Sequence, residues 1–498
     1  METTLTDTQS WIQERIKQDE IVKYLRGGKD FIDEAVLQNT LRKTKNPDKI
    51  KVDAILEKAL SLSTLEAEDT ATLLNVTDGE LWNKIFTVAA QIKRKVYDRR
   101  IVTFAPLYTG NMCVNDCLYC GFRCGNTVTE RRVLTIDEIK KETEILVGTI
   151  GHKRLIVVYG EHPQTDIEYM INSIRAIYSV TVQKGGHDLY IRRVNVNASP
   201  LPIEHLKEIK SLGIGVYQVF QETYHKKTYT HIHPKETIKG SYLWRLYCMH
   251  RAIESGLEDV GIGALFGLYD WKFEVMGLLY HARELERVFG FGPHTISIPR
   301  LEPAVNTPFL QDRKYHVHDE DFKKLVAVLR ISIPYAGLIL TARESALLRR
   351  EVVGIGCTQM DASTRIGIGA YSETACEQIS ERQQFMLGDT RSLDEIVGEL
   401  ADRGSITSFC TAGYRCGRTG KHIMDSLKTG TEAMYCKMNA ILTFREWLND
   451  FASPATKQKG ELLLHKEIHD LKLKYPNEYD ECMGYYQQIM QGKRDIYF

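Results

Sequence analysis

Residues 101–124 read IVTFAPLYTGNMCVNDCLYCGFRC, an apolar run followed closely by four cysteines. The run IVTFAPLYT is rich in β-branched and aromatic residues, which predicts a strand. Cys113, Cys117 and Cys120 have the spacing CX3CX2C and would lie on the loop that leaves this strand. The stretch therefore predicts a strand with a group of thiols just beyond its carboxyl end.

Seven more strand candidates follow and alternate with helical patterns. They read RLIVVYGE, YIRRVNVNAS, IGVYQVFQET, DVGIGALFGL, HTISIPRLEP, GLILTARES and VVGIGCTQM. Alternating strands and helices are typical of parallel βαβ units, and eight strands favour a closed (βα)8 barrel of the TIM type over an open doubly wound sheet. We therefore predict an α/β barrel, with its chemistry at the carboxyl ends of the strands.

Three regions follow from the change of pattern along the chain. Residues 1–98 have apolar residues at three- and four-residue spacing, which predicts a helical extension before the barrel. The barrel is expected over residues 99–371. Residues 372–498 are again helical in pattern and contain further cysteines, so that we expect a C-terminal helical domain there.

Composition excludes several classes of protein. Lys and Arg together number 65, as do Asp and Glu, so net charge favours neither a nucleic acid nor a membrane surface as partner. No stretch approaches the ~18 consecutive apolar residues of a bilayer span, and no secretion signal opens the chain. Eleven cysteines in such a chain indicate reduced thiols rather than a disulfide framework. We expect a soluble, cytoplasmic protein.

The CX3CX2C loop is best explained as a metal site. Three thiolates can hold three irons of a cubane and leave the fourth iron open to another ligand. Zinc is the alternative if Cys124 supplies a fourth sulfur, because a structural zinc site needs four ligands. Packing of three small apolar side chains is the remaining explanation, but Asn115 and Asp116 make the loop polar.

The motif CVNDCLYC resembles the cluster-binding motif of the radical S-adenosylmethionine (SAM) superfamily. The resemblance implies a 4Fe-4S cluster on Cys113, Cys117 and Cys120, with SAM bound to the open iron and cleaved to a 5'-deoxyadenosyl radical. It implies that Tyr119 shields the cluster. It also implies that Gly160 and Glu161, in VVYGEHP, bind the amino group of SAM.

A longer similarity covers most of the chain. The segments CLYCGFR, VYGE, YQVFQETYH, FGLYDW and PRLEPA resemble the aromatic amino-acid lyases of that superfamily, first the maturases of di-iron hydrogenase and next the 2-iminoacetate synthases. The resemblance implies cleavage of the Cα–Cβ bond of L-tyrosine to p-cresol and dehydroglycine, followed by formation of carbon monoxide and cyanide for the hydrogenase H-cluster. Hydrogenase-maturation and electron-donor proteins would be its partners.

The C-terminal cysteines depart from the maturase pattern. That pattern is CX2CX22C, whereas Cys410, Cys416 and Cys436 are spaced CX5CX19C and Gly413 stands at the middle position. A cubane needs three or four thiolates within reach, so a second, auxiliary cluster on these cysteines remains the prediction, with packing cysteines as the alternative. The resemblance further implies that His281 holds a labile iron beside this cluster; neutral imidazole suits ferrous iron.

Polar residues at the strand ends are candidates for binding small molecules. Arg343 could bind the carboxylate of an amino acid, with Thr341 on the same strand face, and Arg300 competes for that role. Asn197, Ser199 and Glu222 could bind ribose hydroxyls. The sequence leaves open whether tyrosine or tryptophan is cleaved, whether the reaction ends at dehydroglycine, whether the protein is instead a non-catalytic iron–sulfur scaffold or carrier, and its oligomeric state.

Overall fold

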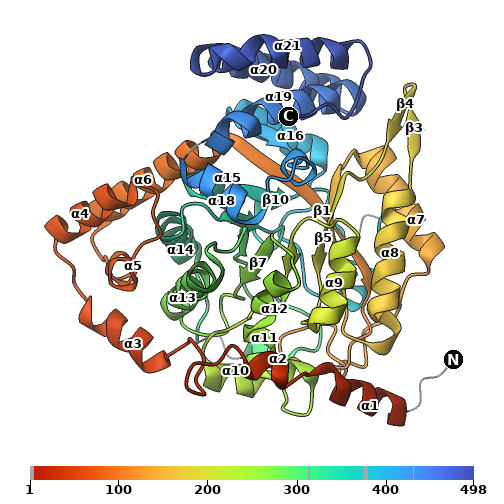
Figure 1. The fold of residues 1–498 in the computed structure, drawn as a ribbon. Helices are drawn as coiled ribbons and strands as arrows, with labels where there is room; N and C mark the ends of the chain where they lie inside the picture. The colour runs from red at the N-terminus through yellow and green to blue at the C-terminus, as the bar shows by residue number, and fades with distance from the viewer. Residues whose placement is uncertain (1–4, 312–313, 374–378, 430) are drawn as a thin grey trace.

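A computed structural model of the chain describes residues 5–311, 314–373, 379–429 and 431–498. Eight parallel strands form a barrel that closes because the first strand pairs with the last, at Val102 and Gln359 (Figure 1). The predicted α/β barrel is confirmed. Its strands are β1 (Arg100–Gly110), β2 (Arg154–Tyr159), β5 (Arg193–Asn197), β6 (Tyr217–Gln218), β7 (Val260–Gly263), β8 (Thr295–Ser297), β9 (Gly337–Leu340) and β10 (Gln359–Asp361).

Strand β1 shows why the apolar runs become barrel strands. All of its eleven residues are buried, as expected for a parallel strand that packs on both faces. The last predicted strand is shorter than its pattern suggested, because Val352, Val353 and Ile355 end a helix, α15, and the strand begins only at Gln359. A short apolar run does not distinguish a buried helix face from a strand.

Helices cover the outside of the barrel, and residues that favour the start or the end of a helix stand at their boundaries. Thr135 and Glu138 form a capping box at the start of α7. Gly290 ends α13 in the left-handed conformation, at φ +81°, where glycine has no steric penalty. The helices of this layer are α7 (Ile136–Glu144), α8 (Ile167–Ser179), α9 (Ile203–Ser211), α10 (Lys226–Ile232), α11 (Tyr242–Leu246), α12 (Cys248–Glu254), α13 (Trp271–Phe289), α14 (Asp319–Ser332) and α15 (Ala346–Ile355).

The N-terminal region is helical, as its pattern predicts, and it packs on the barrel. Helix α6 packs against α14 and α15, and α5 packs against α13. Apolar residues of α3 to α6 belong to the same continuous core as the barrel. The helices are α1 (Leu5–Arg15), α2 (Asp19–Val22), α3 (Glu34–Lys43), α4 (Lys49–Ala59), α5 (Ala67–Leu74) and α6 (Gly79–Tyr97).

The C-terminal region adds a strand as well as helices. Strand β11 (Ile406–Ser408) pairs with the start of β1, so that Arg100 lies opposite Ile406. Helix α19 packs against β11, α20 and α21 in the stack of helices at the top of Figure 1. The helices are α16 (Leu393–Asp402), α17 (Ala412–Arg415), α18 (Gly420–Thr429), α19 (Thr431–Asp450), α20 (Pro454–Lys474) and α21 (Pro476–Met490). A small hairpin, β3 (Val182–Lys184) with β4 (His187–Leu189), was not predicted.

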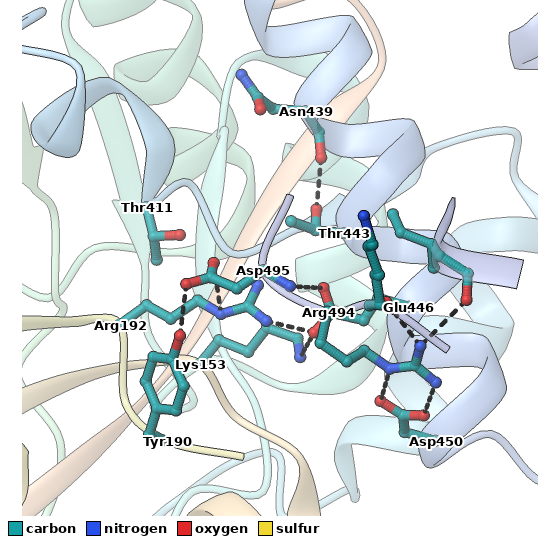
Figure 2. Close-up of polar contacts among 12 residues, drawn as sticks. Lys153, Tyr190, Arg192, Thr411, Asn439, Thr443, Glu446, Asp450, Arg494 and Asp495 are labelled. Atoms are coloured by element: carbon teal, nitrogen blue, oxygen red, sulfur yellow. Dashed lines mark hydrogen bonds and ion pairs between the residues drawn. The ribbon is translucent and has the colours of Figure 1, made fainter. Parts of the chain in front are cut away.

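Buried ion pairs join this C-terminal region to the barrel. The carboxylate of Glu446, on α19, accepts hydrogen bonds from Lys153 at 2.7 Å and from Arg192 (Figure 2). Arg192 also pairs with Asp495 at 3.0 Å, and Arg494 pairs with Asp450. The last residues of the chain are therefore held between α19 and the barrel. Among the described helices, none has the length and apolarity to cross a bilayer.

Candidate functional site

The largest group of predicted site residues surrounds one cavity of about 220 Å³ at the carboxyl ends of the strands. Cys113, Cys117 and Cys120 all line it, and Cys117 is only 4% exposed. Cys124 is exposed and is not among the residues lining the cavity. The structure thus brings the three CX3CX2C thiols together without a fourth sulfur from Cys124, which leaves the zinc alternative without support.

The thiol loop is held in place by hydrogen bonds to neighbouring loops. The Asn115 side chain donates to the Glu161 carboxylate at 2.6 Å and lies 3.7 Å from the sulfur of Cys113. Its carbonyl oxygen accepts from the backbone N–H of Lys239. The Val114 N–H donates to the carbonyl of Glu161. These bonds fix the loop between the ends of β1 and β2.

The donor set fits an iron–sulfur cluster. No disulfide joins any of the three thiols. Burial raises the pKa of Cys113 to about 11 and raises the pKa of Cys117 further. Buried thiols of this kind are neutral by themselves and become thiolates when a metal binds, which releases their protons.

Gly160 and Glu161 lie where the sequence placed them, beside the thiol loop. A Cβ at Gly160 would lie 2.1 Å from the carbonyl oxygen of Met112, so only glycine permits this close approach of the two loops. Glu161 is 6% exposed, and its Oε1 has no hydrogen-bond partner among the described residues. A buried carboxylate oxygen without a partner is costly, and an ammonium group in the cavity would satisfy it.

Tyr119 is buried against the cavity wall. Its hydroxyl lies 3.0 Å from Nε2 of His233, and the two rings meet edge to face. The ammonium of Lys239 lies 5.5 Å from the centre of the Tyr119 ring. The side chain is thus fixed next to Cys117 and Cys120, in agreement with a shielding role.

The three candidates for ribose binding line the cavity but differ in their partners. The side chain of Asn197 has no hydrogen bond to another described residue, whereas Ser199 accepts from Arg15 at 3.4 Å. Glu222 pairs with Lys239 at 2.8 Å and with Arg245 at 3.1 Å. Burial disfavours its charge, but these two cations outweigh burial and lower the pKa of Glu222. Glu222 is therefore an ionised group that is already paired.

The two competing arginines have different positions. Arg343 lines the cavity, with its guanidinium 3.4 Å from the centre of the Phe385 ring, and no ion pair joins it to a described carboxylate. Arg300 is not among the lining residues and binds Glu344 and, at 2.8 Å, Asp319. Arg300 is therefore ion-paired and lies outside the lining of this cavity. Thr341 also lines the cavity, and its buried hydroxyl has no hydrogen-bond partner among the described residues.

Lys239 and Arg245 are cavity residues that sequence reasoning missed. Both follow β6 in the segment HIHPKETIKGSYLWR, where they stand six residues apart, and the acidic residue of that segment, Glu236, is not the carboxylate that pairs with them. Their partner, Glu222, precedes them by 17 and 23 residues. Only the folded loop brings these charges together.

A second cavity, of about 40 Å³, lies at the opposite end of the barrel. Alternate residues of β1 connect the two ends: Arg100 and Val102 line the second cavity, and Tyr108 and Gly110 line the first. Tyr108 is eight positions after Arg100 in this strand, so the two residues are roughly 26 Å apart at ~3.3 Å per residue. The apolar side chains of Phe104, Ile156 and Ile339 form a layer between them.

The second cavity contains some of the predicted auxiliary residues and not others. Cys410 and Cys436 line it, whereas Cys416 is exposed and is not among its lining residues. His281 is also absent from the lining. Its Nδ1 lies 2.9 Å from the Tyr224 hydroxyl, which does not line this cavity either. The structure therefore does not support Cys416 or His281 as ligands at this cavity.

His294 is the imidazole that reaches the second cavity. It stands just before β8, and its Nδ1 lies 3.1 Å from Asp259, while Nε2 lies 3.4 Å from the Tyr414 hydroxyl. No pattern in the sequence predicts that His294 lies at this cavity, because its position depends on the amino ends of β1 and β8 meeting at one end of the barrel. His294, rather than His281, is therefore the imidazole that lines this cavity.

Comparisons with known proteins agree with this architecture. A family model for the radical SAM superfamily matches residues 107–276, and one for the biotin and thiamin synthesis associated domain matches residues 297–406. Together with the barrel and the three-thiol loop, these matches define a radical SAM enzyme.

Solved structures give the family more narrowly. A crystal structure of HydG, described as a maturase of the FeFe-hydrogenase, is 43% identical, with a TM-score of 0.89 over 94% of this chain and 100% of that one. HydG from Carboxydothermus hydrogenoformans is 37% identical, with a TM-score of 0.77 over 92% of this chain and 98% of that one. The 2-iminoacetate synthase of Salmonella typhimurium is 27% identical over 71% of this chain and 89% of that protein. The chain belongs to the HydG family.

Proposed function

We propose that this protein is a radical SAM carbon–carbon lyase that cleaves the Cα–Cβ bond of L-tyrosine to p-cresol and dehydroglycine. The observation that carries the proposal is that three free thiols line the same cavity as Arg343, an arginine that has no ion pair with a described carboxylate. Membership of the HydG family and the likeness to 2-iminoacetate synthases support an amino-acid substrate of this kind.

The residues present fit the cofactors that the family implies. Cys113, Cys117 and Cys120 would hold a 4Fe-4S cluster, and Gly160 with Glu161 would bind the amino group of SAM through a carbonyl and the unpartnered carboxylate oxygen. When bound and reduced, these cofactors supply a 5'-deoxyadenosyl radical, so that the protein itself has to position the substrate and exclude water.

Side chains of the cavity are suited to those two tasks. The guanidinium of Arg343 would bind the substrate carboxylate, and the Thr341 hydroxyl would add a hydrogen bond. Phe385 lies against Arg343 and limits its rotamers. The apolar layer of Phe104, Ile156 and Ile339 closes the cavity on the barrel side, which keeps water from the reacting bond.

The products account for every atom of tyrosine, because p-cresol and dehydroglycine together have its composition. The added reductant is therefore consumed only in converting SAM to methionine and 5'-deoxyadenosine.

Formation of carbon monoxide and cyanide is a second candidate function, favoured by membership of the HydG family. We propose that the reaction ends instead at dehydroglycine, because the second cavity contains two thiols and not three. Electron-donor and hydrogenase-maturation proteins are the partners that the family suggests.

Product analysis tests the proposed function. Anaerobically reconstituted protein, incubated with SAM, dithionite and L-tyrosine, should release p-cresol and 5'-deoxyadenosine in similar amounts, and L-tryptophan should give no indole product. Release of 5'-deoxyadenosine without p-cresol would assign another substrate. Absence of 5'-deoxyadenosine under all conditions would favour an iron–sulfur scaffold or carrier.

We expect Arg343→Ala to weaken tyrosine cleavage by raising KM. A hydrogen bond between charged groups contributes about 1.5–3 kcal/mol, so kcat/KM should fall about 10- to 100-fold. Uncoupled SAM cleavage without tyrosine should persist, because the thiol loop is intact. Arg300→Lys is the matched control, since it retains a cation for Glu344 and Asp319 outside the cavity. Equal effects of the two substitutions would contradict the role of Arg343.

A further inference from the structure

The second cavity lacks the ligand set of a cubane. Among the described residues, its lining includes two cysteines, Cys410 and Cys436, and one imidazole, His294. A cubane needs three or four thiolates. We infer that, of these two cavities, only the first binds an iron–sulfur cluster, on the CX3CX2C loop, and that Gly413 marks the position of a missing third thiol at the second cavity. The inference concerns cluster content and does not require tyrosine to be the substrate.

The loop that contains these residues is held in one conformation. Cys410 has φ +47°, an unusual value for a residue with a side chain, and its backbone N–H donates to the Ser408 hydroxyl. Helix α17 begins two residues later. It ends at Cys416, whose backbone N–H donates to the carbonyls of Ala412 and Gly413. The Cys416 side chain is exposed and is not among the residues that line the cavity.

Contacts on both sides of α17 prevent a rotation that would bring Cys416 inward. Tyr414 lines the cavity and lies between the guanidinium groups of Arg154 and Arg193, 5.7 and 5.3 Å from its ring centre. Arg415 pairs with Asp495 at 2.6 Å and lies 3.8 Å from the ring of Tyr497. Turning the helix would break these contacts together.

The two thiols that do line the cavity have protein partners of their own. The sulfur of Cys410 accepts a hydrogen bond from Arg100 at 3.1 Å. The Cys436 thiol lies 3.8 Å from the Glu432 carboxylate, which pairs with Arg418. The cavity is about 40 Å³, compared with about 220 Å³ at the first site. A cluster would have to displace these partners while bound by only two sulfurs.

Gly413 offers the space that a third thiol needs. It lines the cavity, and a Cβ placed on it would have its nearest neighbour, the Arg418 carbonyl oxygen, at 3.5 Å, an ordinary contact. Gly413 is not among the residues with positive φ, so a cysteine is compatible with its backbone. Gly413→Cys should therefore complete a three-thiol set with Cys410 and Cys436.

Iron and sulfide content, with electron paramagnetic resonance of the reduced protein, tests the inference. We expect about four irons and four sulfides per chain in the wild type and in Cys410→Ala, and one cluster signal in both. Gly413→Cys should gain a second cluster, to about eight irons per chain, and Cys416→Ser, the matched control, should change nothing. About eight irons in the wild type, with half lost in Cys410→Ala, would overturn the inference.

Even if Gly413→Cys fails to fold, the iron contents of the wild type and of Cys410→Ala decide whether the second cavity binds a cluster. This comparison is also independent of the proposed function. Wild-type protein with one cluster and no p-cresol would contradict tyrosine cleavage and leave the inference standing. Protein with two clusters that forms p-cresol would support tyrosine cleavage and contradict the inference.

Discussion

Replacing Cys117 with alanine should abolish the proposed SAM cleavage. Cys117 is one of the three thiols that line the first cavity in the described part of the chain, and a cubane held by two of them is expected to be lost. Because the cofactor supplies the chemistry, release of 5'-deoxyadenosine should fall at least about 1,000-fold, and iron should fall to a small fraction of the wild-type content. Anaerobic product analysis and iron determination on the same preparation measure both effects.

Cys124→Ala is the control for this substitution. Cys124 belongs to the same loop but is exposed and outside the cavity. Substitutions at exposed positions change free energies by about 0.5 kcal/mol or less, so activity should stay within about twofold of the wild type. If Cys124→Ala lost the cluster as Cys117→Ala does, four thiols rather than three would bind the metal, and the open coordination position would not exist.

Replacing Glu446 with alanine should cause the largest loss of stability. Its carboxylate is fully buried and neutralises both Lys153 and Arg192, which are also buried (Figure 2). Removal of one partner from a buried ion pair costs about 3–5 kcal/mol, because here Lys153 would lose its carboxylate and Arg192 would keep only Asp495. Urea unfolding should show this decrease in the free energy of unfolding. Asp402→Ala, in the exposed pair with Lys459, should cost less than about 1 kcal/mol.

The contribution of Glu446 should also depend on pH. Burial opposes its ionisation, but Arg192 and Lys153 outweigh burial and hold the pKa of Glu446 well below its usual value. A carboxyl group with a lowered pKa in the folded state stabilises the protein above the unfolded pKa, about 4.3, and loses that contribution as the pH falls further. The wild type should therefore lose stability more steeply than Glu446→Ala below about pH 4. Parallel acid profiles would contradict the ion-pair role.

Much of the fold and part of the candidate site could be predicted from local patterns. The eight strand candidates lie at the eight strands of the barrel, because apolar strand patterns and helix caps act over a few neighbouring residues. The grouping of Cys113, Cys117 and Cys120 also follows from local spacing, since one short loop cannot separate them by much. Gly160 and Glu161 follow for a similar reason, because adjacent parallel strands end side by side.

Tertiary structure alone decided which polar residues face a cavity. Arg300 and Arg343 both follow strands, yet one is neutralised by Glu344 and the other is available, a difference set by a carboxylate 44 residues away from Arg300. His294 and not His281 lines the second cavity, and Cys416 is exposed, because these positions depend on contacts across the barrel. The sequence by itself determined the strand order and the thiol loop through short-range geometry. The choice of partners for each charge depended on the whole packed molecule, since a charge is satisfied by whatever folding brings next to it.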